Sequence, residues 1–322
     1  MRVMVTGATG FVGRALCAEL MVRGYSVRAA LRQVEARQEL SRGVEPVIVG
    51  TISAATDWRA ALAKCDAVVH LAARVHVTRD EASDPMAEFR AVNVDSTLNL
   101  ALQAAAAGAR RFVYLSSIKV NGEVTQPNCA FSSADVPAPL TAYGISKLEA
   151  EDGLRALAVK TGVEVVIIRP PLVYGPGVKA NFLSMMRWLW RGIPLPLGAI
   201  HNRRSLVGLD NLVDLIVTII DHPATANQTF LACDGEDLST TELLLKMGDA
   251  LGKPAKLISV PADILVLGAK LLGKPEIAQR LCCSLQVDIS KARKLLGWMP
   301  PVSVDEGFRR TARHFLASLS GR

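Results

Sequence analysis

Three glycines spaced three residues apart restrict the fold of this chain more than any other feature. Gly7, Gly10 and Gly13 follow a short apolar segment, residues 2–6, and open a helix-like segment, residues 10–23. In such a strand-to-helix turn the first glycine permits the tight turn, the second lets a pyrophosphate approach the backbone, and the third lets the helix pack on the strand. The amides of the helix N-terminus would face the phosphates. The pattern predicts a dinucleotide site, with a plain glycine turn as the alternative.

Strand-like and helix-like segments alternate over the first half of the chain. The expected strands are residues 2–6, 26–31, 46–49, 67–71, 111–115 and 163–168, and the expected helices are residues 10–23, 58–63, 86–107 and 142–159. Strands rich in valine and isoleucine, separated by helices, predict an α/β fold: a Rossmann-like, doubly wound parallel sheet with helices on both faces.

The texture changes after residue 169, where prolines and glycines interrupt the pattern. A strand at residues 228–233 and helices at residues 209–221, 240–251 and 304–319 are still expected. We therefore predict an NAD(P)-binding domain over residues 1–168, joined by residues 206–233. A smaller α/β substrate-binding lobe would comprise residues 169–205 and 234–322.

Composition excludes several other classes of protein. The 37 basic and 30 acidic residues leave a net charge of +7, and 50% of the residues are hydrophobic, as in a globular chain. The basic residues are not interleaved with aromatic ones, so no nucleic-acid partner is expected. Charged and proline residues interrupt the longest apolar stretch, residues 257–272, which predicts a buried or groove-lining helix and not a membrane span.

The cysteines and the N-terminus bear on the location of the protein. The six cysteines lack the spacing of metal ligands, which predicts a reduced protein without a metal site. Met1 leads directly into an apolar strand, so no signal peptide is expected. Both features favour the cytoplasm.

The end of the second expected strand bears on the choice of cofactor. An acidic residue at this position would bind the adenosine ribose of NAD. Arg32 stands there instead, with no Asp or Glu in the strand. Because arginine suits a 2′-phosphate, NADP(H) is favoured over NAD(H), and an enzyme that takes either remains the alternative.

A second group of residues points to proton-transfer chemistry. Tyr143 and Lys147 are four residues apart in an expected helix, so they share one face. A lysine charge beside a phenol favours the phenolate, which would let the tyrosine exchange a proton near neutral pH. Ser116 and Ser117 end the fifth expected strand, at the sheet edge where ligands of open parallel sheets bind.

These motifs together resemble the extended short-chain dehydrogenase/reductases, and among them the nucleotide-sugar epimerase/dehydratase group. The resemblance covers nearly the whole chain. It is carried by residues 6–13, 70–73, 93–94, 115–117, 143–147, 169–170, 173–177 and 295–298. It implies that Ser117 orients a sugar oxygen, that Tyr143 is the acid/base, and that Lys147 binds the nicotinamide ribose and tunes Tyr143.

The resemblance and the glycine turn together give a set of expected contacts. The expected cofactor contacts are Gly7, Thr9, Gly10, Phe11, Val12, Gly13, Arg32, Leu71, Ala72, Ala73, Asn93, Ser116, Tyr143, Lys147 and Pro170. The expected substrate contacts are Ser117, Asn181, Leu197 and Arg204, with Arg204 on the diphosphate because of its charge and fork geometry. His76 is a weaker candidate for a substrate contact, and His70 is expected to be a packed histidine. The resemblance also implies a homodimer formed through the helices at residues 86–107 and 142–159.

The same resemblance narrows the reaction. The 4,6-dehydratases carry an acidic pair just after the catalytic hydroxyl residue, whereas this chain has Ile118 and Lys119, which are unsuited to water elimination. A narrower likeness is to bacterial surface-polysaccharide enzymes that act at C4 of UDP-N-acetylhexosamines.

The narrower likeness leads to two hypotheses, and likeness to the fold alone adds a third. The leading one is reduction of a UDP-4-keto-6-deoxy-N-acetylhexosamine by NADPH in O-antigen biosynthesis. The alternative is a UDP-glucose or UDP-N-acetylglucosamine 4-epimerase with tightly bound NAD. A non-catalytic NADP-sensing regulator is a remote third, since such proteins typically lose the tyrosine that this chain retains.

Overall fold

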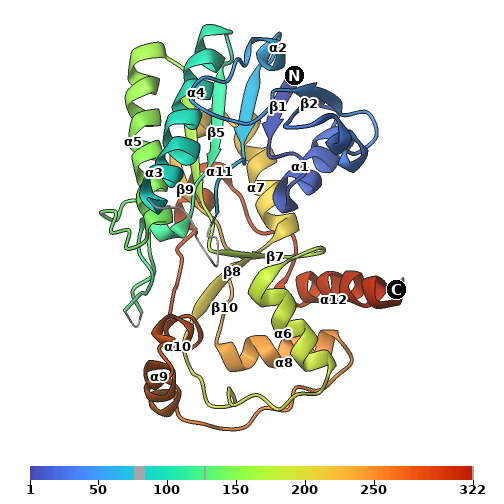
Figure 1. The fold of residues 1–322 in the computed structure, drawn as a ribbon, viewed down its shortest axis with the longest axis vertical. Coiled ribbons are helices and arrows are strands. Elements are labelled where there is room, and N and C mark those ends of the chain that lie inside the picture. Colours follow the sequence, from blue (N-terminus) through green and yellow to red (C-terminus); the bar gives the residue numbers. More distant parts are fainter. Residues whose placement is uncertain (76–83, 127, 321–322) are drawn as a thin grey trace.

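The strands expected in the first half of the chain form the main sheet, together with one strand from the second half. A computed structural model describes residues 1–75, 84–126 and 128–320. Its larger sheet has seven parallel strands in the order β3-β2-β1-β4-β5-β6-β9 (Figure 1). The bounds are β1 Arg2–Thr6, β2 Ser26–Leu31, β3 Glu45–Ile48, β4 Ala67–His70, β5 Arg111–Leu115, β6 Glu164–Arg169 and β9 Thr229–Leu231. The strand order reverses between β1 and β4, which is where open α/β sheets bind ligands. The predicted Rossmann-like fold is confirmed.

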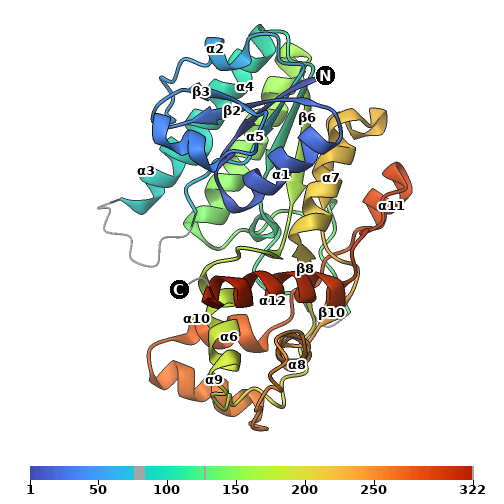
Figure 2. The ribbon, with the colours of Figure 1, turned by 90° about the vertical axis from the view of Figure 1, so that its right-hand side faces the viewer.

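Alternate residues of the central strands face two different cores. Val3 and Val5 of β1 lie in one apolar cluster, whereas Met4 between them lies in another. Helices α1 (Phe11–Val22) and α7 (Leu209–Asp221) pack on the first cluster, and α2 (Arg59–Leu62), α4 (Ser96–Ala106) and α5 (Ala142–Thr161) pack on the second. Because successive side chains of a strand point to opposite faces, the apolar strands fill both cores and helices cover both faces of the sheet (Figures 1 and 2).

A smaller sheet and the remaining helices form the other part of the molecule. This sheet has the order β10-β8-β7, with β7 Leu172–Tyr174, β8 Arg204–Gly208 and β10 Asp237–Leu238. Around it lie α6 Ala180–Trp190, α8 Thr240–Ala250, α9 Ala262–Leu271, α10 Pro275–Cys282 and α12 Val304–Ser320 (Figure 1). The shorter elements are α3 Pro85–Arg90, α11 Ser290–Leu296, a π-helical turn Ala91–Asp95 and 3-10 turns at Val34–Glu39, Ile118–Val120 and Pro223–Thr225. A third apolar cluster, which includes Tyr174, Phe182 and Phe308, holds this part together. The domain boundaries drawn from the sequence stay a prediction.

Two helices differ from the sequence expectation. The single helix expected over residues 86–107 is interrupted by the π-helical turn that contains Asn93. Of the buried or groove-lining helix predicted within residues 257–272, the buried alternative is wrong, because α9 begins only after Pro261 and none of its residues is buried. The groove-lining alternative stays a prediction. Apolar residues at helical spacing identify a helix, but they do not tell whether its apolar face meets the core. In the described parts of the chain, every helix is too short or too polar to cross a bilayer.

Candidate active site

The turn between β1 and α1 leaves no room for a side chain at Gly7 or Gly13. Gly7 has φ +66°, and a Cβ there would lie 2.9 Å from the amide nitrogen of Ala72. A Cβ on Gly13 would lie only 2.0 Å from the carbonyl oxygen of Gly7. The hydroxyl of Thr6 fixes the neighbouring strand end, because it accepts from the amides of Leu71 and Ala72 at 3.2 Å each. The ends of β1 and β4 are thereby held together beside the turn.

This turn has the properties that a pyrophosphate requires. Gly10 precedes α1 without a side-chain cap, and the first turn of α1 contains no acidic residue. The N-terminal amides and the positive end of the helix dipole therefore meet no competing carboxylate of that turn. The cradle between Gly7, Gly10 and Ala72, which a Cβ would fill, fits a dinucleotide.

His70, at the end of β4, is a buried residue that packs beneath this turn. Its Nδ1 lies 2.7 Å from the Thr6 hydroxyl and its Nε2 lies 3.0 Å from the Thr97 hydroxyl. Burial, together with the smaller effect of the Lys147 charge, lowers the pKa of His70 to about 3. The ring is therefore neutral near pH 7 and joins β1, β4 and α4, as expected of a packed histidine.

Tyr143 and Lys147 lie near the start of α5, on one face of the helix. Thr141 caps this helix, accepting from the amide of Gly144 at 3.2 Å. The Lys147 ammonium is buried, donates to the carbonyl of Leu115 at 2.8 Å, and lies 5.9 Å from the centre of the Tyr143 ring. Burial lowers the pKa of Lys147 to about 7, whereas Glu151 raises it.

The Tyr143 phenol differs from the sequence expectation in its pKa. Burial raises the pKa of Tyr143 to about 12, and a hydrogen bond with Ser117 lowers it. Desolvation therefore dominates the pKa of Tyr143 in the protein alone, contrary to the lowering by Lys147 that the sequence predicts. Tyr143 is a neutral phenol near pH 7 that can donate a proton, and it becomes a base only where further positive charge stabilises the phenolate.

The two serines at the end of β5 have different surroundings. Ser117 starts the 3-10 turn Ile118–Val120, where its hydroxyl accepts from the Lys119 amide at 3.3 Å. Ser116 points elsewhere, donating to Oε1 of Glu151 at 2.6 Å. Of the two hydroxyls, only that of Ser117 is thus left to face Tyr143, with which it shares a hydrogen bond.

A buried ion pair supports this strand end, and sequence reasoning missed it. Glu151 is fully buried and accepts from Arg169 through Nε at 2.9 Å and Nη2 at 2.6 Å. Arg169 also donates to Asn121 at 2.9 Å, next to the 3-10 turn. The available signal was spacing, since Tyr143, Lys147 and Glu151 recur every four residues along one face of α5.

Asn93 joins two parts of the expected cofactor site. Its side chain accepts from the amide of Arg74 at 2.8 Å and donates to the carbonyl of Arg74 at 3.0 Å. It also donates to the Ser146 hydroxyl at 3.1 Å, and so links the segment after β4 to α5. The π-helical turn that interrupts the expected long helix contains this side chain. His76 lies outside the described residues.

The remaining expected contacts fall into exposed and packed residues. Arg32 is exposed at the end of β2, and Asn181 is exposed in the first turn of α6. Leu197 is buried in the third apolar cluster, and its carbonyl accepts from Thr241 at 2.6 Å. Arg204 donates to the carbonyl of Cys283 at 2.9 Å, and burial lowers the pKa of its guanidinium. The structure brings Ser117, Tyr143 and Lys147 together, but Leu197 is committed to packing.

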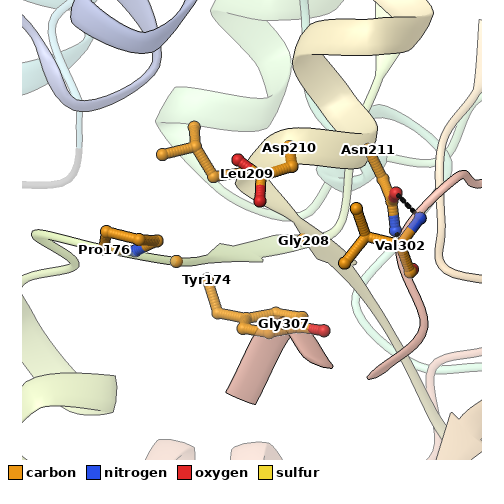
Figure 3. Close-up of a pocket in the computed structure, with 9 residues that line it drawn as sticks. Tyr174, Pro176, Gly208, Leu209, Asp210, Asn211, Val302 and Gly307 are labelled. Carbon is orange, nitrogen blue, oxygen red and sulfur yellow. Dashed lines mark hydrogen bonds between the residues drawn. The ribbon is translucent and has the colours of Figure 1, made fainter. Parts of the chain in front are cut away.

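A polar cluster elsewhere in the molecule surrounds a small pocket, shown in Figure 3. Asp234 accepts from Tyr174 at 2.8 Å and from Asn211 at 2.7 Å. Asn211 in turn exchanges two hydrogen bonds of 2.8 Å with the backbone of Val302. These groups satisfy one another, so the cluster joins the small sheet, α7 and the segment before α12 as a structural element. Across the described residues, no cluster of His, Cys, Asp or Glu is arranged to hold a metal.

Comparison with known proteins identifies the family of this chain. A profile described as the NAD dependent epimerase/dehydratase family matches residues 3–233. The chain is 49% identical over 316 residues to a UDP-glucose 4-epimerase of Vibrio cholerae, covering 98% of this chain and 95% of that protein. It is 26% identical over 326 residues to an N-acetyl-α-D-glucosaminyl-diphospho-ditrans,octacis-undecaprenol 4-epimerase of Escherichia coli O157:H7, covering 97% and 94%.

A solved structure agrees with the fold. UDP-glucuronic acid 4-epimerase from Bacillus cereus, in complex with NAD, superposes with a TM-score of 0.79 at 23% identity and covers 99% of both chains. The family profile spans the whole main sheet, from β1 to β9, and the Vibrio relative spans nearly the entire chain. The chain belongs to the NAD-dependent epimerase/dehydratase family.

Proposed function

We propose that this protein is a 4-epimerase of a UDP-linked hexose or N-acetylhexosamine that keeps its NAD through the reaction. The observation that carries the proposal is the meeting of Ser117, Tyr143 and buried Lys147 at the carboxyl edge of a sheet whose first turn fits a dinucleotide. Among C4 reactions, 49% identity to a UDP-glucose 4-epimerase favours epimerisation. This reverses the order of the two leading sequence hypotheses.

The cofactor would be held mainly by backbone and small side chains. The turn at Gly7 and Gly10 and the N-terminus of α1 would bind the pyrophosphate, with Ala72 alongside. Tyr143 and Lys147 would bind the nicotinamide ribose. A bound nicotinamide dinucleotide supplies a hydride acceptor and donor for the sugar carbon.

The chain itself handles the proton. An alcohol at C4 that becomes a ketone loses a hydride from carbon and a proton from oxygen, and Tyr143 is the group placed to take the proton and return it. Ser117 would hold the same oxygen by a hydrogen bond. Lys147 supplies positive charge beside the phenol, and Glu151 favours its charged form by raising the lysine pKa.

Water elimination is unsupported by the residues next to Ser117. Ile118 is buried, and Lys119 pairs with Glu123 at 2.9 Å. Neither offers the free carboxyl group that a dehydratase needs to move a second proton. The proposal therefore stays with chemistry at C4 alone.

A reductase is the second candidate, and Arg32 favours it. Its exposed guanidinium at the end of β2 suits the 2′-phosphate of NADP, and no acidic residue of the strand replaces it. A reductase consumes its cofactor and must exchange it, whereas an epimerase retains it. The fate of the cofactor separates the two.

The test measures cofactor and product together. The full chain is denatured to release and identify its dinucleotide, and a fresh sample is incubated with UDP-glucose and UDP-N-acetylglucosamine without added cofactor. We expect bound NAD and conversion to the 4-epimer, which Tyr143→Phe abolishes. Empty protein that consumes NADPH with a UDP-4-keto sugar and forms no epimer would establish the reductase instead.

A separate experiment is needed to identify the carrier to which the sugar is joined through its diphosphate. Arg204, the expected diphosphate contact, would suit any glycosyl diphosphate. The Escherichia coli relative acts on a sugar diphosphate joined to undecaprenol. Parallel reactions with the undecaprenyl-linked and the UDP-linked sugar decide between the two carriers, and we expect the UDP-linked sugar to react faster.

The oligomeric state, location and pathway are also part of the proposal. Helices α4 and α5 pack side by side (Figure 1), and the exposed Leu102 on α4 supports a homodimer through this face. All six cysteines are free, which supports a reducing compartment such as the cytoplasm. A role in surface-polysaccharide biosynthesis follows from the family resemblance.

A further inference from the structure

Helices α9 and α10 form a tip in the part of the molecule that lies away from the main sheet and the N-terminus (Figures 1 and 2). Along α9, Ile264, Leu267 and Leu271 are 59%, 60% and 80% exposed. Their spacing places them on one helix face, which we call the α9 stripe. An outward apolar stripe of this kind typically marks an interaction site.

The stripe does not arise from a detached segment, because the other side of the tip is anchored. Leu265 packs on the third apolar cluster, and α9 packs on α10. At the end of α10, the carbonyl of Leu281 accepts from Asn202 at 3.2 Å and from Thr240 at 2.6 Å. The fold therefore holds the α9 stripe outward.

The charges around the stripe identify what would cover it. Helices α9 and α10 and the turn between them contain three basic side chains, Lys270, Lys274 and Arg280, and two acidic ones, Asp263 and Glu276. Arg280 pairs with Glu276 at 3.4 Å. Lys270 and Lys274 are exposed beside the stripe and make no ion pair with any residue that the structure describes.

We propose that this tip docks on an anionic membrane surface. The α9 stripe would enter the boundary between headgroups and acyl chains, and Lys270 and Lys274 would meet lipid phosphates. A bilayer surface of this kind offers both an apolar layer and negative charge. A second copy of the tip offers only the apolar part, and its positive charge would oppose pairing.

Docking would place the substrate lobe at the bilayer. The carbonyl of Cys283, directly after α10, accepts from both Asn202 and Arg204 at 2.9 Å. The docking tip is thus joined through hydrogen bonds to the arginine expected to bind the diphosphate. The docking proposal does not depend on the reaction proposed above, because vesicle binding is measured without turnover.

The test is flotation of the full chain with vesicles. One set of vesicles is phosphatidylcholine alone, and the other contains about 30% phosphatidylglycerol, which gives the surface negative charge. We expect flotation with the second set and little with the first. Leu271→Glu should lower the partition coefficient by about tenfold or more, because an apolar contact is lost and a negative charge is added.

Val22→Glu is the matched control, since Val22 is 81% exposed on α1, far from the tip, and Leu271 is 80% exposed. Both variants lower the net charge by one, so a difference between them isolates position from charge. We expect Val22→Glu to float like the parent protein. Both substitutions are at exposed positions, and circular dichroism checks that both variants fold.

Three results would overturn the proposal. The parent protein could fail to float with anionic vesicles, or Leu271→Glu could float as well as Val22→Glu. Alternatively, Leu271→Glu could reduce the molecular mass in solution while no variant binds vesicles, which would show that a second copy covers the stripe.

Discussion

The turn after β1 and the face of α5 that carries Tyr143, Lys147 and Glu151 are built in opposite ways. The turn is made of backbone, and an added methyl group at Gly13 would meet a carbonyl oxygen at 2.0 Å. The α5 face is made of long side chains whose charges are buried and compensated by partners far along the chain. Substitutions in the turn should therefore destabilise the protein by steric clash. Substitutions on the α5 face should act by leaving a buried charge or proton without its partner.

The largest effect should come from the phenol itself. Tyr143→Phe keeps the ring but removes the proton that the proposed reaction needs, so turnover should fall by about a thousandfold. Product formation by chromatography measures the loss. Thermal unfolding is the control, and we expect a midpoint close to that of the parent protein because the ring still packs. A Tyr143→Phe variant with full turnover would show that Tyr143 is not the acid/base of the reaction.

Glu151→Gln tests whether a buried carboxylate of α5 contributes more to the free energy of unfolding than an exposed one of the same helix. The change leaves Arg169 buried without its counter-charge, at a cost of about 3 kcal/mol in the free energy of unfolding. Asp152→Asn is the matched control, since that carboxylate is 64% exposed and pairs with the exposed Arg155 at 2.9 Å. We expect less than about 0.5 kcal/mol for the control. Denaturant unfolding of both variants measures the difference, and equal losses would contradict the described charge balance.

Gly13→Ala tests the turn, where the expected loss is steric. Its Cβ cannot fit without moving the Gly7 carbonyl, so we expect a loss of about 2 kcal/mol in the free energy of unfolding. Gly268→Ala is the control, because a Cβ there meets nothing within 4 Å. That variant should gain up to about 1 kcal/mol from helix propensity. A stable Gly13→Ala protein would mean that the turn is not closed by backbone.

The contrast between the turn and the α5 face also explains what could be predicted from the sequence. The glycine turn depends on residues within one strand and one helix, so its spacing alone indicates the structure. The pair Tyr143 and Lys147 is likewise set by one helical turn. Glu151 and Arg169 became visible as a unit only in the structure, because a helix and a strand end 18 residues apart must first be placed together.

For the α9 stripe, the sequence predicts the helix correctly but not its exposure. Its apolar spacing predicts a helix correctly, yet the direction of the apolar face depends on which neighbours cover it. Among the described residues, α10 and the third cluster pack on the other side of α9, and the stripe stays outside. Local pattern identifies elements, whereas tertiary contacts decide burial and charge compensation.

The smallest effect should be a slope of stability with pH that belongs to the α5 face alone. Burial lowers the pKa of Lys147 from 10.5 to about 7, and Glu151 acts against this. Between these pH values the unfolded chain keeps a proton that the folded chain releases. The free energy of unfolding therefore rises with pH across this window, by at most about 1.4 kcal/mol for each pH unit from this group.

Lys147→Met should remove that contribution, so its stability should rise less steeply between pH 7 and 10 than that of the parent protein. Lys160→Met removes an exposed lysine from the same helix and should leave the slope unchanged. Urea unfolding at several pH values measures all three proteins under the same conditions, which cancels the titration of tyrosines and cysteines that they share. Parallel slopes for the parent protein and Lys147→Met would show that Lys147 remains charged when buried. The α5 face would then hold a permanent ammonium beside Tyr143, and its contrast with the uncharged turn would be sharper still.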